Sequence, residues 1–371
     1  MSAPPAPPGA RAGAAPRRPD AAWPALRWGL VAALLAFAAV FPLVFTSELV
    51  TQIAVDTLIF AGAAAAWNIF SGYSGYISLG HAVFFGAGAY TAAVAAQDWQ
   101  ISGAAEFLLM PVGAAVAALI AVPFGLVALR VRRHTFVVIT IAVFFIFQLM
   151  AYNLSVTGGS VGINAPFLGW APQTYNNPFY YLALIIAAGT TALSWLIRRS
   201  RFGLQLRAIR DDEDRARGLG VRAMRVKLAA FVISAVVMGL IGALWFFFIV
   251  QVLPQYGFNP LVDLSIALMA FLGGLGRVAG PVLGALLLEP GQQYLTLHYS
   301  NSYVSEIILG ALFLLVILFL PRGILPFAEE QITAWRGRRA DQGGRFSGTE
   351  PGGRPQQRAP AAGTPGGGAA R

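Results

Sequence analysis

Long apolar runs separated by short polar segments make up most of this 371-residue chain. A helix needs about 20 apolar residues to cross the hydrocarbon core of a bilayer. Such runs predict transmembrane spans near Trp28–Phe45, Leu49–Phe70, Leu79–Ala96, Phe107–Leu129, Thr135–Asn153, Phe179–Ile197, Val226–Val250 and Val304–Leu320. The pattern therefore predicts an all-α polytopic membrane protein.

Two shorter apolar stretches, Leu261–Leu275 and Gly280–Leu295, precede the last span. Lipid excludes unpaired backbone unless protein covers it, so this pair is either two short crossings or a re-entrant hairpin. Both alternatives place the following span and the C-terminus on the same sides of the membrane. With the pair included, the sequence predicts about 8–10 transmembrane helices.

The composition narrows the function classes. Hydrophobic residues make up 57% of the chain and charged residues 11%, whereas a soluble domain carries roughly a quarter charged residues. The chain has no cysteine and only three histidines, so disulfides and thiolate metal sites are excluded and no metal site is predicted. Serine, histidine and aspartate form no recognisable nucleophile–base pattern, so no catalytic residue is predicted.

The net charge of +10 comes from basic residues that lie next to apolar runs. This placement favours membrane orientation over nucleic-acid binding, so membrane lipid is the expected surrounding. With the N-terminus inside, Arg130–Arg133, Arg198–Lys227 and the C-terminal arginines all fall on the inner side, and the outer loops contain no Lys or Arg. The positive-inside rule predicts a multi-pass membrane protein with both termini cytoplasmic.

Polar ends flank the apolar region. Residues 1–26 are rich in Pro, Ala and Arg, and residues 336–371 are rich in Gly, Pro and Arg. Neither end has enough apolar surface to order itself, so both are predicted to be disordered cytoplasmic tails. They enclose a transmembrane domain of residues 27–322, in which residues 199–225 form the longest inner loop.

The segment GYSGYISLGHAVFFGAGAYTA, Gly72 to Ala92, concentrates glycines and polar side chains between apolar runs. Glycines in a span favour either close helix packing or a helix that unwinds beside a solute. Polar groups at membrane depth usually face a cavity or the bundle interior. A lone histidine such as His81 is more often a hydrogen-bonded packing residue than a proton carrier.

Two further stretches stand out. The inner loop from Ser200 to Lys227 is predicted to form a short charged helix closed by Gly218 and Gly220, which is either a solvated connector or a helix that docks into a partner's groove. In FLGGLGRVAGPVLGA, close helix packing is the favoured role of the glycines, namely Gly273, Gly274, Gly276, Gly280 and Gly284. A phosphate-binding loop is excluded because no strand precedes these glycines and no GK[ST] follows.

Three motifs resemble permease subunits of branched-chain amino-acid ABC importers, of the LivM type. They are NIFSGYSGYISLGHAVFFGAGAYTAA (residues 68–93), the stretch from Arg201 to Leu244, and FLGGLGRVAGPVLGALLLE (residues 271–289). They occur in the family's order, and the resemblance covers about Leu49 to Leu320. It implies an importer subunit, not an enzyme, that translocates branched-chain or other hydrophobic amino acids.

The resemblance also implies partners and residue roles. The expected partners are a second permease subunit of the LivH type, two cytoplasmic ATPases that use ATP and Mg, and an external binding protein; no cofactor is expected on this chain. The ATPase-coupling residues would be Arg210, Asp211, Asp212, Glu213, Asp214, Ala216 and Gly220, with Arg215 in place of the family's small residue. The solute pathway would be lined by Gly72, Tyr73, Gly75, Ser78, Gly80, His81, Phe84 and Phe85.

Two alternatives stay open. Related permeases carry urea, amides or other small organic solutes, and the binding protein, rather than the permease, filters the cargo. A secondary transporter that works alone would call for buried acids or ion-coordinating clusters in several spans. Asp56, Asp263 and Glu289 fall in or near spans, but they form no succession that a proton relay would need.

Overall fold

The computed structural model describes residues 22–298 apart from 102, 167–169 and 171, together with scattered residues between 307 and 331. Most of both predicted tails and most of the predicted span Val304–Leu320 lie outside the described residues. Residues 326–371 group as a separate unit, of which only 326, 327 and 331 are described.

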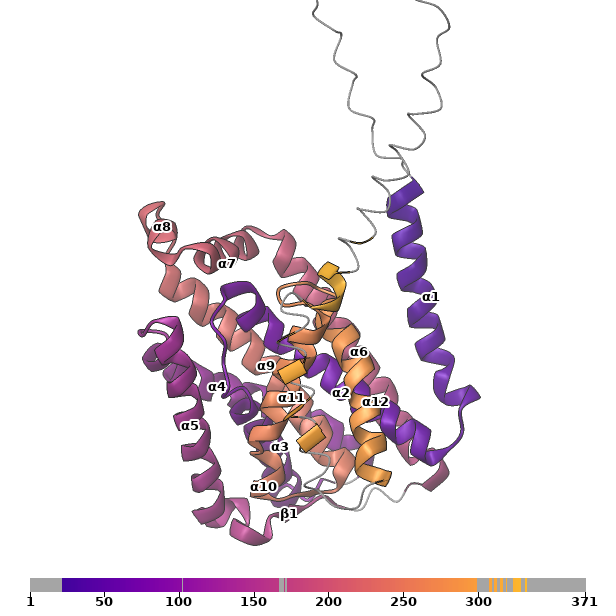
Figure 1. Ribbon diagram of the computed structural model, residues 1–371. Coiled ribbons are helices and arrows are strands. Elements are labelled where there is room, and N and C mark those ends of the chain that lie inside the picture. The colour runs from indigo at the N-terminus through magenta and orange to yellow at the C-terminus, as the bar shows by residue number, and fades with distance from the viewer. Residues whose placement is uncertain are drawn as a thin grey trace, which may run out of the picture. The chain divides into compact units, whose positions relative to one another are not determined.

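The described chain is almost entirely helical (Figure 1). The α-helices are α1 (Ala22–Val44), α2 (Glu48–Trp67), α3 (Ala82–Asp98), α4 (Met110–Ala128), α5 (Arg133–Asn153), α6 (Pro172–Arg199), α7 (Arg201–Asp211), α8 (Glu213–Gly218), α9 (Ala223–Ile249), α10 (Pro254–Gly257), α11 (Pro260–Gly273) and α12 (Gly280–His298). The π-helical turn Asn68–Gly72 extends α2, and the 3₁₀ segment Gly103–Leu109 precedes α4. Strands β1 (Ile163–Asn164) and β2 (Gln251–Val252) form one antiparallel pair, with Ile163 opposite Val252.

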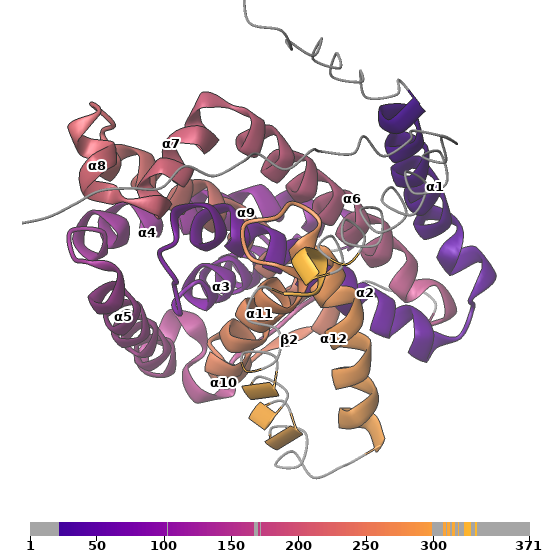
Figure 2. The ribbon, with the colours of Figure 1, turned by 45° about the horizontal axis from the view of Figure 1, so that its top comes forward.

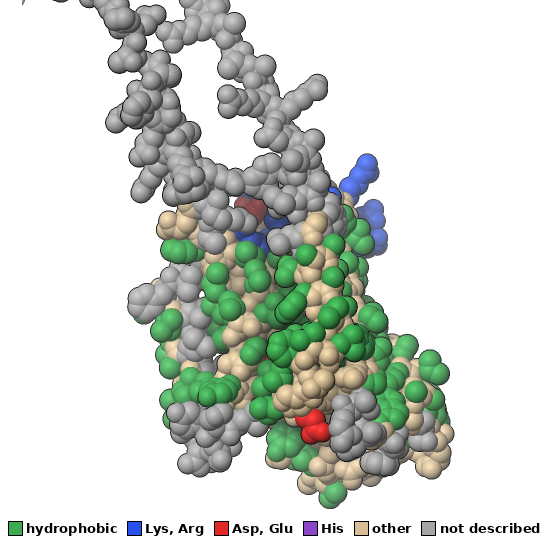
Figure 3. Space-filling model, turned by 90° about the vertical axis from the view of Figure 1, so that its right-hand side faces the viewer, with side chains coloured by type: hydrophobic (Ala, Val, Ile, Leu, Met, Phe, Trp, Pro, Cys, Tyr) green, Lys and Arg blue, Asp and Glu red, His purple; other side chains and the backbone are tan. Residues whose placement is uncertain are grey.

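Six described segments are long and apolar enough to cross a membrane: Glu48–Gly72, Gly103–Ala128, Arg133–Asn153, Tyr175–Arg199, Ala223–Ile249 and Pro254–Gly273. The prediction of an all-α polytopic membrane protein is confirmed. Hydrophobic side chains cover much of the described surface on one flank, as a lipid-facing surface requires (Figure 3). Helix α1 lies at the periphery, where the Tyr180 hydroxyl of α6 donates to the Ala38 carbonyl at 2.7 Å (Figure 2).

Helix α9 forms the centre of the bundle and packs against α3 and α4, while α2 packs against α6 and α12. Glycine permits the close approach of these backbones. A Cβ at Gly242 of α9 would overlap the carbonyl oxygen of Phe85 in α3, and a Cβ at Gly88 of α3 would overlap that of Gly239 in α9. The α3–α9 contact is therefore a backbone-to-backbone contact.

Gly242→Ala is expected to destabilise the protein by about 1–3 kcal/mol, because a methyl group here forces α3 and α9 apart. Thermal unfolding in detergent measures the loss. Gly189→Ala in α6 is the matched control, since nothing lies within 4 Å of its Cβ position, and its gain in helix propensity of about 1 kcal/mol should leave it no less stable. Equal unfolding temperatures for the two variants would contradict a tight α3–α9 contact.

The third span differs from its prediction. A continuous helix over Leu79–Ala96 was expected, but α3 begins at Ala82 and residues 75–80 are not helical. Gly75 has a φ of +72°, which a glycine adopts readily. Side chains satisfy the backbone of this segment: the Trp67 indole donates to the Ser78 carbonyl at 2.8 Å, and Thr140 Oγ1 accepts from the Leu79 amide at 3.2 Å. The gap between the predicted spans Leu49–Phe70 and Leu79–Ala96 already marked most of this break, and only its continuation to Ala82 was not predicted.

The short apolar pair forms two adjacent helices, α11 and α12. A Cβ at Gly273 would overlap the Gly280 carbonyl, and one at Gly284 would overlap that of Met269. The turn between the helices lies beside Gly72 and α7. The bundle thus has a basic end, defined by Arg130–Arg133, α7 and α8, and an opposite end with α10 and the β1–β2 pair (Figure 1).

Candidate functional site

The charged loop at the basic end forms two helices, α7 and α8, and not the single short helix predicted from the sequence. The Ser200 hydroxyl caps α7 by accepting from the Gly203 amide at 3.2 Å. Asp212 then has extended backbone (φ −156°, ψ 108°), which ends α7. Its carboxylate caps α8 by accepting from the amides of Asp214 and Arg215, each at 3.0 Å. We call residues 209–213 the α7–α8 corner.

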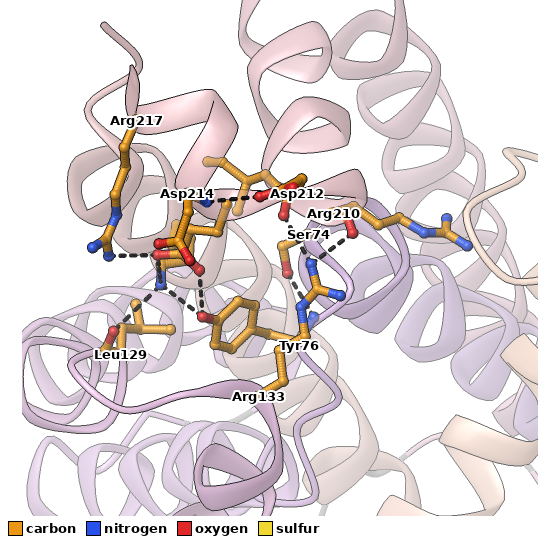
Figure 4. Close-up of polar contacts among 11 residues, drawn as sticks. Ser74, Tyr76, Leu129, Arg133, Arg210, Asp212, Asp214 and Arg217 are labelled. Atoms are coloured by element: carbon orange, nitrogen blue, oxygen red, sulfur yellow. Dashed lines mark hydrogen bonds and ion pairs between the residues drawn. The ribbon is translucent and has the colours of Figure 1, made fainter. Parts of the chain in front are cut away.

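Two arginines fix this corner to the bundle (Figure 4). Arg133, at the start of α5, donates to the carbonyls of Ile209 at 2.8 Å and Arg210 at 2.6 Å. A cation is favourable there because the last carbonyls of a helix carry partial negative charge. Arg210 in turn donates to the Gly72 carbonyl at 2.8 Å. The corner is thereby joined to the end of α2, 138 residues earlier in the chain.

The same end of α2 holds the turn between α11 and α12. The fully buried Asn68 accepts from the Gly276 amide at 2.8 Å and donates to the Arg277 carbonyl at 2.9 Å. The role of Asn68 was not predicted from the sequence, although an amide inside an apolar run was a usable signal. Segments from three regions of the chain, around residues 70, 210 and 276, therefore meet at one point.

The outer side of α8 faces away from the bundle. Among the predicted coupling residues here, Asp214 and Gly220 are exposed and Ala216 is buried. The side chain of Arg215 is 87% exposed and pairs with Asp212 at 2.9 Å, so the replacement of a small residue by arginine causes no internal clash. Gly220 has a φ of +87° and leads the chain back to α9. Such a surface is available to a partner protein.

The predicted pathway residues lie inside the bundle in this conformation. The Tyr73 hydroxyl lies 2.7 Å from the Ser194 hydroxyl of α6. His81 Nε2 lies 2.9 Å from the Ser234 hydroxyl, and the His81 ring packs against Phe84 and Phe231. Contact of these side chains with a solute stays a prediction.

A buried carboxylate lies at the start of α3. Asp263 of α11 is 2% exposed and faces the backbone amides of His81 and Ala82, although neither amide reaches hydrogen-bond geometry with it. The first turn of a helix has unsatisfied amides and attracts negative charge, and α3 has no side-chain cap of its own. Asp263 thus lies in front of the uncapped first turn of α3 without a hydrogen bond to it. Within the described residues, no group of three or more His, Cys, Asp or Glu could hold a metal ion.

Comparison with known proteins decides the family. Residues 49–317 match the branched-chain amino acid transport system permease component, and this range includes every segment that meets at the basic end. The chain belongs to this permease family. The permease is 28% identical over 335 residues to the high-affinity branched-chain amino acid transport system permease protein LivM of Escherichia coli K12, covering 81% of the permease and 75% of the relative.

Two other relatives match shorter parts of the permease. The LivH permease protein of the corresponding E. coli system is 34% identical over 134 residues, covering 36% of the permease and 42% of that protein. The autoinducer 2 import system permease protein LsrC of Yersinia pseudotuberculosis is 30% identical over 148 residues, covering 38% and 41%. No solved structure matches the permease significantly. The chain is a multi-pass membrane subunit of the ABC-importer permease type.

Proposed function

We propose that this permease translocates branched-chain or other hydrophobic amino acids across the bacterial inner membrane. An external binding protein would deliver the solute, a LivH-type subunit would supply the second half of the pathway, and two cytoplasmic ATPases would use ATP and Mg to drive transport. The relatives named LivM and LivH support this assembly.

The α7–α8 corner is the observation that carries the proposal. A capped helix pair projects from the basic end, with exposed side chains on its outer side and fixed contacts to α2 and α5 on its inner side. This is the arrangement expected of a loop that docks on an ATPase. Closure of the ATPase dimer by ATP would displace the corner and shift the bundle between outward-open and inward-open states.

Replacing Asp214 or Gly220 tests the exposed outer side of α8 and the turn that follows it. Both residues are exposed, and no atom lies within 4 Å of a Cβ at Gly220, so the strain of an alanine at a φ of +87° is confined to the backbone there. Variants at either position are expected to hydrolyse ATP without transport while staying folded. Full uptake in a well-expressed Asp214→Ala, Gly220→Ala double variant would contradict the assigned docking surface.

The orientation predicts a labelling pattern. The chain has no cysteine, so a single introduced cysteine reports its own side of the membrane. Val161→Cys, 76% exposed at the opposite end, should react with a membrane-impermeant maleimide in intact spheroplasts. Leu219→Cys, 85% exposed after α8, should react only after permeabilisation. The reverse pattern would place the corner outside the cell and overturn ATPase docking.

Reconstitution tests the proposed function as a whole. The permease, its co-encoded permease partner, ATPases and binding protein are placed in proteoliposomes, and uptake of labelled leucine is measured with and without ATP. Uptake that requires the ATPases and ATP supports the proposal. Uptake driven by an ion gradient with this chain alone would support the secondary-transporter alternative instead.

A second cargo class has one observation in its favour, the similarity to a permease named for autoinducer 2 import. Urea, amides or other small organic solutes would be transported by the same kind of complex with a different binding protein. The ligand bound by the co-encoded binding protein distinguishes the two, since a tightly bound hydrophobic amino acid supports the first proposal.

A further inference from the structure

Lys227 is the single lysine of the chain, in which all other residues of the Lys and Arg total of 26 are arginine. From the sequence, it was expected to be one of the charges of the inner loop. The structure instead places it in the second turn of α9, with its side chain 1% exposed. A buried cation needs partners for its charge and its donors, so its surroundings identify what it does.

Three acceptors from three segments surround the ammonium group. Lys227 Nζ lies 2.9 Å from Glu213 Oε1, 3.1 Å from the Tyr76 hydroxyl and 3.4 Å from the Leu129 carbonyl at the end of α4 (Figure 4). It also lies 4.2 Å from the centre of the Tyr76 ring. A compact ammonium with three diverging donors suits this arrangement, whereas a planar guanidinium would not fit it in the same way.

Glu213 connects this cluster to the corner. It is the first residue of α8, and its carboxylate accepts from the Tyr76 hydroxyl as well as from Lys227. Burial acts to raise the pKa of Glu213, but the hydrogen bonds from Tyr76 and Lys227 outweigh it and hold the pKa below the ordinary value of 4.5. Glu213 therefore stays ionised at neutral pH, and the stabilisation that goes with its lowered pKa would be lost only as the pH falls through that pKa.

Tyr76 connects the cluster to the broken span. It lies in the non-helical segment between Gly75 and Gly80, and five residues later His81 precedes the first turn of α3. Its ring packs edge-on against Phe136 of α5 at 5.5 Å. The residues between Tyr76 and α3 are not helical. A displacement of Tyr76 can therefore displace them without breaking the hydrogen bonds of a helical turn.

We propose that Tyr76, Glu213 and Lys227 are positioning residues that convert a displacement of α8 by a partner ATPase into a displacement of residues 76–81, and hence of the start of α3. The inference rests on the proposed function and adds the route by which the docked loop reaches the pathway. Arg210 and Arg133 hold the corner in place, and the Glu213–Tyr76 contact carries its movement inward.

Tyr76→Phe tests the inference because it removes the hydroxyl and keeps the ring between Lys227 and Phe136. Leucine uptake and ATP hydrolysis are measured in the same proteoliposomes, and uptake per ATP hydrolysed is expected to fall about tenfold, with hydrolysis and ATPase assembly unchanged. Tyr180→Phe is the matched control, since it also loses a buried tyrosine hydroxyl bond, to the Ala38 carbonyl, but far from the corner. It should keep the wild-type ratio.

A second readout does not depend on the cargo. Ile77→Cys in this cysteine-free chain reports the segment next to Tyr76, and its maleimide reaction rate is compared with and without ATP and vanadate. The rate should change with nucleotide in the otherwise wild-type complex and not when Tyr76→Phe is added.

The outcomes separate the two proposals. If the wild-type complex shows neither ATP-dependent uptake nor a nucleotide effect on Ile77→Cys, the proposed function fails. If it shows them and Tyr76→Phe keeps the wild-type ratio and nucleotide effect, the positioning role is refuted. Loss of ATPase assembly in Tyr76→Phe would also refute it, by showing that the cluster only holds the fold together.

Discussion

Replacing Arg210 by alanine is expected to leave ATP hydrolysis running while solute uptake falls by about tenfold to a hundredfold. The guanidinium donates to the Gly72 carbonyl at 2.8 Å, and the Arg133 guanidinium holds the Arg210 carbonyl at 2.6 Å. Hydrogen bonds to a charged group contribute about 1.5–3 kcal/mol, which sets the expected range. Parallel uptake and hydrolysis measurements in proteoliposomes give the result.

Arg207→Ala is the control for this variant. Arg207 lies on the same helix, but its side chain donates only to the nearby carbonyls of Gly203 and Arg198. Its loss should leave transport close to wild type. If the Arg210 and Arg207 variants behave alike, the connection between α7 and the end of α2 has no part in transport, and any arginine on α7 serves only the helix itself.

Gly80→Val is expected to reduce uptake to background while the ATPases still assemble with the permease. A Cβ at Gly80 would lie 2.6 Å from the Thr140 carbonyl of α5. Because this neighbour is backbone, the segment must move away from α5, at a cost of about 1–3 kcal/mol. The exposed outer side of α8, where the ATPases are proposed to dock, is not part of this segment. Uptake and co-purification of the ATPases measure the two effects separately.

Gly29→Val provides the comparison for the added bulk, since nothing lies within 4 Å of a Cβ at Gly29 in α1. It should transport normally. Gly75→Val should resemble Gly80→Val, because valine is strained at a φ of +72° and its Cβ would lie 2.9 Å from Arg210 Cγ. Normal uptake in both bulky variants would mean that these glycines serve only close packing.

The hydropathy pattern predicted most of the helices because a bilayer demands long apolar runs. The expected span Thr135–Asn153 corresponds to α5 (Arg133–Asn153), and Phe179–Ile197 lies within α6. The same pattern left residues 71–78 between two predicted spans but began the third span three residues too early, at Leu79 instead of Ala82. The segment 75–80 is held by Trp67 and Thr140, and contacts of this kind leave no periodic signal in the sequence.

The site was predicted in part, by resemblance to the family. That resemblance placed Arg210 and Glu213 in the coupling loop, but not their partners, which lie 138 and 137 residues earlier in the chain at Gly72 and Tyr76. Lys227 was misplaced because a lysine at the end of a basic loop normally stays in water. The contact of α8 with α9, through the Glu213–Lys227 ion pair, shows that its charge is buried and paired.

The burial of Lys227 also determines how the protein reacts with amine-directed reagents. Amine-reactive reagents find one side-chain target in the whole sequence, and in this conformation its ammonium is enclosed by Glu213, Tyr76 and the Leu129 carbonyl. Apart from the α-amino group, the permease should therefore resist acylation until α8 swings away from the bundle. The rate at which Lys227 is modified would then report how often α8 moves away from the bundle.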